Sequence, residues 1–337
     1  MSQTASLACA ALLSLGLGLW AGGCGPSGAS QPRPAESVFP RPAAGEFSVM
    51  TFNVNQYALV DRDGQADTLE PKPPAEAADL VDVIRQVAPD VLAVQEMGDP
   101  AAWAEFKYRL RQAGLEYGHE EYLRRGKSEL NLAVLSRFPI VARRSHVDDL
   151  YTIGPTRFPV MRGFIDIDLA VAPDYRLRLM VAHLKSKVFH SFGQAEMRRN
   201  EARLLNNHVR AALKENPDVN LLVAGDFNDD PDSAVLREIA TYQHQRLLHD
   251  LRPVDAVGDA WTHRENDDHY HRIDYLLASE GLRPETIPAK TFAVRSPLLF
   301  RSSDHRPIVA TFVAAERPSA AAPDLATNLP PAIPTND

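Results

Sequence analysis

The segment Leu-Leu-Val-Ala-Gly-Asp-Phe-Asn at residues 221–228 constrains this chain more than any other. Its four leading apolar residues predict a strand buried on both faces, and Gly225 allows the backbone to turn after it. A carboxylate, Asp226, and an amide, Asn228, are delivered just past the strand end. The pair suits catalysis, but it also suits an ordinary Asx turn, in which both side chains bond the local backbone. Whether the pair is catalytic or structural depends on whether polar residues also follow the other predicted strands.

Composition and bias divide the chain into one folded region and two flanking segments. Of 337 residues, 45% are hydrophobic and 24% are charged, which is typical of a globular protein. Residues 25–45 and 314–337 are rich in Pro, Ala, Ser and Gly, so they cannot bury enough apolar surface to fold. They predict a tether and a tail around a single domain at residues 46–313. The net charge of -8 argues against a protein that binds nucleic acid through a basic surface alone. It does not argue against an enzyme that binds phosphate through a metal cation.

The first 24 residues predict export. Both cysteines of the chain, Cys9 and Cys24, lie here, so no disulfide can join parts of the folded region. Residues 7–20 form an apolar run that is too short to span a bilayer comfortably, and small residues lead into Cys24. The pattern resembles a bacterial lipoprotein signal, although residues 1–5 contain no Lys or Arg; an ordinary cleaved signal peptide is the alternative. We expect an exported protein, held at the outer membrane or cell surface by acyl chains on Cys24.

Periodicity within residues 46–313 predicts many strands and few helices. The predicted strands are residues 47–54, 91–94, 120–123, 130–135, 163–169, 177–182, 221–224, 272–278 and 308–313. The predicted helices are residues 75–87, 101–113, 194–213 and 233–240. This balance favours a mixed α/β (α+β) sandwich, with two stacked sheets and helices outside, over a doubly wound sheet.

Polar side chains follow the predicted strands at several places. They are Asn53, Glu96, His183, Asp226, Asn228, Asp274, Asp304 and His305. Carboxylate and amide oxygens suit a hard cation such as Mg²⁺, which completes its shell with water and phosphate. Imidazoles can bond phosphoryl oxygens or transfer protons. Zinc fits less well, because the chain has neither an HxxxH motif nor a Cys cluster. The set indicates metal-assisted hydrolysis of a phosphoester.

Seven short motifs resemble those of the endonuclease/exonuclease/phosphatase superfamily, and they occur in the same order. They are TFNV, VQE, LSRFP, HLKS, GDFN, RIDYLL and SDHRP, and they extend over nearly all of residues 46–313. The resemblance implies a four-layer, deoxyribonuclease-like sandwich and hydrolysis of phosphoester bonds. It also implies Mg²⁺ as the cofactor, with Mn²⁺ or Ca²⁺ as alternatives.

The resemblance assigns the metal and the attacking water to residues on these motifs. Glu96 is expected to be the principal metal ligand, with Asn53 beside it. Asp304 is expected at the same metal or at a second one. Asp226 is expected to orient or deprotonate the attacking water, and Asn228 to lie beside it on the phosphate.

Two histidines and an arginine are implied to contact phosphate. His305 is similar to the histidine that contacts the scissile phosphate, and Asp274 to the carboxylate that fixes its tautomer. His183 matches a second histidine of the nuclease branch. Arg162 corresponds more loosely to a phosphate-binding arginine.

The motifs leave the substrate open. HLKS and the following GQAExxRxNEARLL resemble extracellular bacterial nucleases, so we expect DNA or RNA rather than lipid, cleaved by a monomer. The alternative enzyme is a sphingomyelinase-like or inositol or sugar-phosphate esterase, for which residues 295–301 are the candidate apolar hairpin. The alternative outside enzymes is a catalytically silent binding module, which should lack one of the key polar residues. Residues 267–271 predict a solvated loop rather than a second metal site, and Glu129 is a possible brace for His183.

Overall fold

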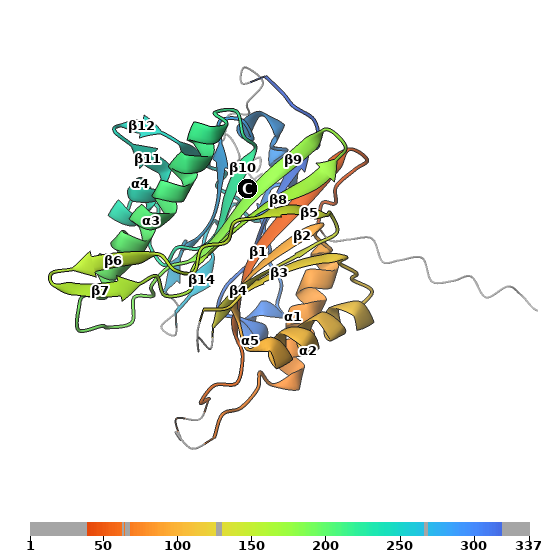
Figure 1. Ribbon diagram of the computed structural model, residues 1–337. Coiled ribbons are helices and arrows are strands. Elements are labelled where there is room, and N and C mark those ends of the chain that lie inside the picture. Colours follow the sequence, from red (N-terminus) through yellow and green to blue (C-terminus); the bar gives the residue numbers. More distant parts are fainter. Residues whose placement is uncertain (1–38, 63, 65–67, 126–129, 266–268, 319–337) are drawn as a thin grey trace, which may run out of the picture. The chain divides into compact units, whose positions relative to one another are not determined.

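The computed structural model describes residues 39–62, 64, 68–125, 130–265 and 269–318 (Figure 1). The predicted signal with Cys24, most of the predicted tether and tail, and Glu129 lie outside these residues. Phe39 stacks on Phe292 with 5.4 Å between ring centroids, and the Ala314 N–H donates to the Gly45 carbonyl. Packed structure therefore extends a few residues beyond both edges of the predicted domain. None of the described helices has the length and apolar character that crossing a membrane requires.

Two six-stranded mixed sheets form the centre of the fold (Figure 1). In spatial order, the first consists of β17 (Phe292–Ala293), β18 (Ile308–Val313), β1 (Glu46–Tyr57), β2 (Val91–Met97), β4 (Asn131–Ser136) and β3 (His119–Leu123). The second consists of β13 (Leu248–Asp250), β16 (Asp274–Ser279), β10 (Leu221–Asp226), β9 (Tyr175–His183), β8 (Phe164–Ala172) and β5 (Ile140–Arg143). Each sheet contains one parallel pair, β1 with β2 and β9 with β10, and antiparallel neighbours around it.

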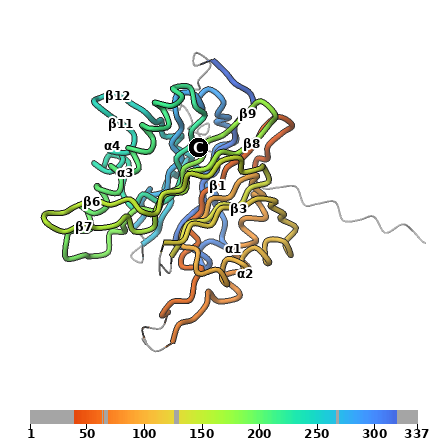
Figure 2. The backbone as a smooth tube through the Cα atoms, in the orientation of Figure 1, coloured from red at the N-terminus to blue at the C-terminus, as the bar shows by residue number. Residues whose placement is uncertain are grey.

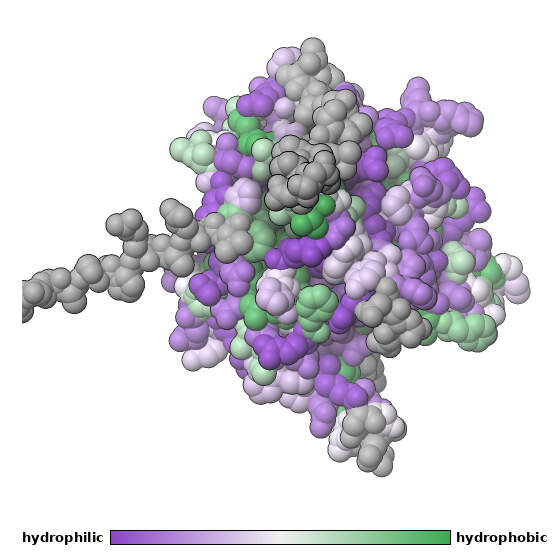
Figure 3. Space-filling model, turned by 180° about the vertical axis from the view of Figure 1, so that it is seen from behind, coloured by the Kyte–Doolittle hydropathy of each residue, from purple (hydrophilic) through white to green (hydrophobic). Residues whose placement is uncertain are grey.

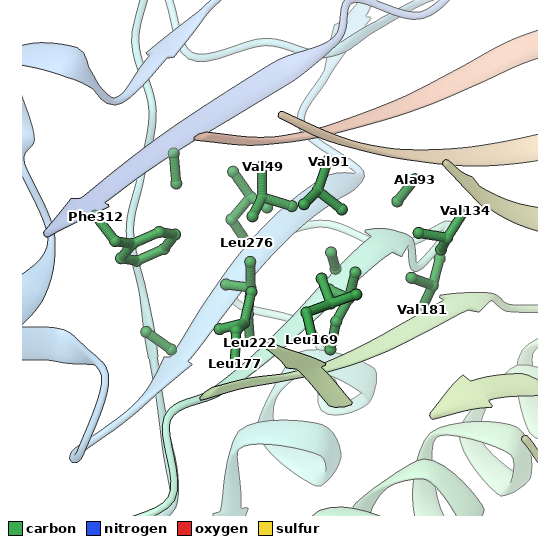
Figure 4. Close-up of a cluster of buried hydrophobic side chains, with 14 of the residues drawn as sticks. Val49, Val91, Ala93, Val134, Leu169, Leu177, Val181, Leu222, Leu276 and Phe312 are labelled. Carbon is green, nitrogen blue, oxygen red and sulfur yellow. The ribbon is translucent and has the colours of Figure 1, made fainter. Parts of the chain in front are cut away.

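The two sheets pack face to face through buried aliphatic side chains. Val49 and Val91 of the first sheet belong to the same buried cluster as Leu222, Leu276 and Val181 of the second (Figure 4). Burying a side chain of this size stabilises a fold by about 1.5–3 kcal/mol relative to leaving it in water. The continuous apolar run of β10 is explained by this arrangement, because the strand is covered on both faces, and β1 is likewise buried on both faces over most of its length.

Helices cover the outer faces of both sheets. α1 (Pro74–Val87), α2 (Pro100–Gln112) and the short α5 (Leu299–Ser302) pack on the first sheet. α3 (Gln194–Glu215) and α4 (Ala234–Ala240) pack on the second, and Figure 2 shows them on the opposite side of the sandwich from α1 and α2. The result is the predicted four-layer sandwich of mixed α and β structure. On the face seen in Figure 3, hydrophilic residues predominate and apolar ones are scattered.

Several short elements were not predicted, because strands of two to four residues carry too little periodicity. They are β5, the hairpins β6 (Leu150–Ile153) with β7 (Thr156–Pro159), β11 (Thr241–Tyr242) with β12 (Gln245–Arg246) and β14 (His263–Arg264) with β15 (Tyr270–His271), β13 and β17, and the 3₁₀ turns η1 (Arg283–Glu285) and η2 (Pro288–Lys290). The apolar hairpin considered for residues 295–301 is wrong: this stretch leads into α5, and Leu299 is buried.

Gly225 lies inside β10 rather than in a turn after it. Its φ is 134°, and a Cβ atom at this position would overlap the carbonyl oxygen of Ala182 on β9. β9 and β10 approach this closely because Gly225 has no side chain. The register then places Asp226 directly beside His183. This glycine therefore sets the spacing of two predicted site residues.

We expect Gly225→Ala to destabilise the fold by at least ~2 kcal/mol, since the added methyl group forces β9 and β10 apart. Gly114→Ala is the matched control: Gly114 also has a positive φ, 80°, but a Cβ there has open space. The control should lose only the ~1 kcal/mol expected for the strained backbone. Urea unfolding of both variants measures the difference, and equal losses would contradict a steric role for Gly225.

Candidate active site

Residues from both sheets line a single cavity of about 250 Å³ at one end of the sandwich. The lining residues predicted from the sequence are Glu96, His183, Asp226, Asn228, Asp304 and His305. Asn53 and Asp274 lie directly behind them and bond to them. The structure thus brings together all of the predicted site residues except Arg162, although their positions in the sequence span some 250 residues.

The first sheet presents Glu96 through a distorted strand end. Glu96 has a φ of 64°, in the left-handed region, and the pairing of β1 with β2 shifts register between Asn53 and Tyr57. Such irregularities re-aim side chains at strand ends. One Glu96 oxygen, Oε2, accepts a hydrogen bond of 2.8 Å from the Gln56 N–H, and Oε1 lies 3.9 Å from His183 Nε2. The carboxylate is therefore fixed by the backbone and directed into the cavity.

Asp226 occupies the centre of the site. Its Oδ2 accepts a 3.0 Å hydrogen bond from Asn53 Nδ2 and lies 3.3 Å from His183 Nε2 and 3.8 Å from His305 Nε2. Its Oδ1 accepts a 2.9 Å bond from the Asn228 N–H. Burial, and then the charge of Asp274, raise the pKa of the Asp226 carboxyl well above its usual range. A carboxylate with a raised pKa is a better proton acceptor near neutral pH.

The two histidines at the site have opposite tendencies to protonate. Burial alone would lower the pKa of His305, but the charge and hydrogen bond of Asp274, at 2.9 Å from Nδ1, outweigh it and raise the pKa to about 10. Burial, followed by the positive charges of Arg162 and His305, lowers the pKa of His183 well below its usual value. At neutral pH, His305 is therefore a cation and His183 a neutral imidazole. Such divergence between neighbouring titratable groups is typical of acid and base roles.

Arg162 lies behind the cavity instead of lining it. Its guanidinium is buried and donates hydrogen bonds of 3.4 and 3.3 Å to the carbonyls of His183 and Leu184. Asn228 Nδ2 donates to the same Leu184 carbonyl. Both side chains thus hold the backbone that leaves β9, and the geometry gives Arg162 a support position. Its predicted contact with phosphate stays a prediction.

The sequence model of the Endonuclease/Exonuclease/phosphatase family matches residues 50–305, which include every polar residue of this cavity. The chain belongs to this family. Proteins of the family are metal-dependent phosphoester hydrolases. No curated protein sequence matches the chain significantly.

Solved structures of the family share the fold at low sequence identity. The human nocturnin catalytic domain with bound sulfate is 18% identical, with a TM-score of 0.58 over 83% of this chain and 97% of that one. Truncated TDP2 of Caenorhabditis elegans is 20% identical, with a TM-score of 0.55 over 80% and 98%. Sphingomyelinase C of Streptomyces griseocarneus is 19% identical, with a TM-score of 0.54 over 79% and 99%.

The donor set of the cavity fits the divalent cation that the family uses. Glu96, Asp226 and Asp304 line the cavity with carboxylate oxygens, which are ligands that Mg²⁺, Mn²⁺ and Ca²⁺ prefer. The amide oxygen of Asn53 lies behind them and accepts a hydrogen bond from the Asn55 N–H, so the predicted role of Asn53 as a ligand stays a prediction. Asp304, His305 and His263 also have ligating atoms within 4.8 Å of one another. The same holds for Asp226, Asp274 and His305. Glu96 belongs to neither of these groups, so its role as the principal metal ligand stays a prediction.

Among the histidine and acidic residues of the cavity, the predicted site did not include His263, Glu265 and His271. The ring of His263 lies 4.6 Å from that of His305, and its Nε2 lies 3.6 Å from Asp304. His271 pairs with His263 across the β14–β15 hairpin, so the solvated-loop interpretation is wrong for His271. Asp267 and Asp268 lie outside the described residues. The sequence does contain a pattern that could have indicated this hairpin: two histidines, His263 and His271, flank a short acidic segment directly before the RIDYLL motif.

Asp274→Asn should lower the pKa of His305 by about one to three pH units, because the variant removes the nearest negative charge. NMR titration of the His305 ring in metal-free protein measures this directly, with Asp168→Asn in the same sheet as the control. An unfolded histidine has a pKa of about 6.5. The raised pKa therefore contributes stability that is complete below about pH 6.5 and is lost as the pH rises through about 10. An unchanged His305 titration in Asp274→Asn would contradict the assignment.

Proposed function

We propose that this protein is an exported, Mg²⁺-dependent phosphodiesterase that hydrolyses DNA or RNA. The observation that carries the proposal is the position of Asp226, whose Oδ2 lies within 4 Å of both histidines in the cavity that also holds Glu96. In-line attack on a phosphodiester places negative charge on the phosphoryl oxygens, so groups aimed there lower the barrier.

In this proposal each residue of the cavity has a separate role in hydrolysis. Asp226 orients water and accepts its proton, as its raised pKa favours. His305, held as a cation by Asp274, donates to a phosphoryl oxygen, and neutral His183 provides a second hydrogen bond. Glu96, with Asn53 and Asp304, would hold the cation, which supplies Lewis-acid polarisation of the phosphate when bound. Asn228 fixes the carboxylate of Asp226 through its backbone N–H.

A second candidate function is hydrolysis of a phospholipid. It is favoured by exposed apolar residues in the loop after β9: Val188 is 72%, Phe189 81% and Phe192 44% exposed. Val188 also lines the cavity, so an apolar surface lies at its mouth. Sphingomyelinase C, by its name an enzyme of lipid, shares the fold. The assay below separates lipid from nucleic acid.

The purified protein with Mg²⁺ should cleave plasmid DNA or RNA and leave sphingomyelin vesicles intact, and EDTA should abolish cleavage. Asp226→Ala should reduce the rate by roughly 10²–10³-fold, the loss typical for a group that acts on the transition state. Asp218→Ala, an exposed aspartate outside the cavity, is the matched control and should retain full activity.

Two results would overturn the proposal in different ways. Hydrolysis of sphingomyelin without cleavage of nucleic acid would establish the lipid alternative. Cleavage that survives Asp226→Ala, or that needs no divalent cation, would contradict the proposed mechanism itself.

The anchor is a separate proposal that rests on the sequence of the first 24 residues. Expressed in a bacterium with its leader, the protein should incorporate labelled palmitate and fractionate with membranes. Cys24→Ser should abolish both properties, whereas Cys9→Ser, the matched control within the apolar run, should retain them. Release of unlabelled wild-type protein into the medium would instead show an ordinary cleaved signal.

A further inference from the structure

Five arginines converge on a groove of about 720 Å³ beside the second sheet. They are Arg237 of α4, Arg246 of β12, Arg252, Arg272 and Arg283 of η1. The acidic residues that line the same groove are Asp232 and Asp250, so its lining carries five positive and two negative charges, a net of +3 with histidine neutral. The whole chain carries -8. The groove is thus a local concentration of positive charge on an acidic protein.

Three of these arginines make no ion pair among the described residues. Arg272 pairs with Asp250, with 3.1 Å between Nη1 and Oδ1, and Arg283 pairs with Glu280 at 2.8 Å. Arg237 donates to the backbone carbonyl of Asp232, while Arg246 and Arg252 are exposed. Guanidinium groups left without a carboxylate are available to bind an external anion.

The ordinary interpretation of exposed arginines is that water solvates them. Two features of this groove argue for a ligand. Its floor is apolar, formed by Leu236, Leu248 and Leu277, so the arginines stand around a concave surface instead of projecting separately. The backbone of Arg252 is held at a φ of 48°, and its N–H donates to Asp250. Strained conformations of this kind cluster at binding and active sites.

The groove begins within one residue of the candidate active site. Asp230 contacts His271 and Lys187, which both line the catalytic cavity, and the next residue, Pro231, lines the groove. Likewise, Arg272 of the groove lies between His271 and Ile273 of the cavity. The groove and the cavity therefore adjoin along the chain at two places, Asp230–Pro231 and His271–Ile273.

We propose that this arginine groove binds the phosphate backbone of a nucleic-acid strand on one side of the scissile bond. The inference rests on the proposed function and assigns a second contact surface to the same nucleic-acid substrate. Arginine forks bind phosphate oxygens in pairs and with directional hydrogen bonds, which suits a repeating phosphate chain. A sphingolipid or sugar phosphate has no row of phosphates and would leave the groove unused.

The test compares wild-type protein with the double variant Arg246→Gln/Arg252→Asn, since asparagine tolerates the left-handed backbone at position 252. Binding of a fluorescent 20-nucleotide single strand is measured by anisotropy in EDTA, between 50 and 200 mM salt. If each arginine contacts one phosphate, the slope of log K against log salt should fall by about 1.4. Affinity should fall roughly tenfold or more. Hydrolysis of bis(4-nitrophenyl) phosphate with Mg²⁺ should not change, because neither residue lines the catalytic cavity.

Arg176→Ala is the matched control, because this exposed arginine lies at the opposite end of β9 from His183. It should leave both the slope and the affinity as in the wild type. A double variant with an unchanged slope would overturn the groove proposal, even if the small diester is still hydrolysed. Displacement of the strand by equimolar pyrophosphate would also overturn it, in favour of a small-anion site. Failure to hydrolyse any diester, combined with binding that depends on both arginines, would reject the proposed function and retain the groove.

Discussion

The site depends on one hydrogen bond that joins the two sheets. Asn53 on β1 donates through Nδ2 to Oδ2 of Asp226 on β10, at 3.0 Å, and both residues are buried. The Asn53 carbonyl in turn accepts from the Ser303 hydroxyl, whose oxygen accepts from the His305 N–H. Buried polar groups are costly unless they are bonded, so this chain of contacts fixes the distance between the sheets at the cavity.

Burial gives the neighbouring titratable groups different chemistry. Asp226, Asp274, His183 and His305 are all almost inaccessible to water, and two carboxyls so placed disfavour each other's charge. His305 resolves part of that conflict by becoming a cation between them, whereas His183, next to Arg162, remains neutral. A single buried cluster thereby contains a proton acceptor, a cation and a neutral donor. If the same residues were exposed to water, their pKa values would be close to the ordinary ones, and the two histidines would not differ in protonation state.

Sequence reasoning succeeded where a residue's position along a strand determines its position in space. Glu96, His183 and Asp226 lie at the ends of strands whose apolar runs are long enough to recognise. His183 and Asp226 end neighbouring strands of one sheet, and the stacking of the two sheets adds Glu96 from the other. The function of Gly225 was misjudged, because its close approach to Ala182 depends on pairing with a strand some 40 residues earlier. His263 and His271 were missed for a similar reason: two-residue strands leave no periodic pattern, and only the folded hairpin brings the His263 ring next to His305 and His271 opposite His263.

The arginine groove shows that the total charge of the chain does not describe its local surface charge. Its five arginines are spread over residues 237–283, with acidic residues between them, so no basic run occurs in the sequence. Charges on a protein surface act over roughly 8 Å at physiological ionic strength, which is shorter than the distance across a domain. A phosphate chain near the groove therefore responds to the local +3 and scarcely to the -8 of the whole chain. The proposed cation would lie in the acidic cavity, so under the two proposals the cation and the arginines would act on different phosphates of one strand.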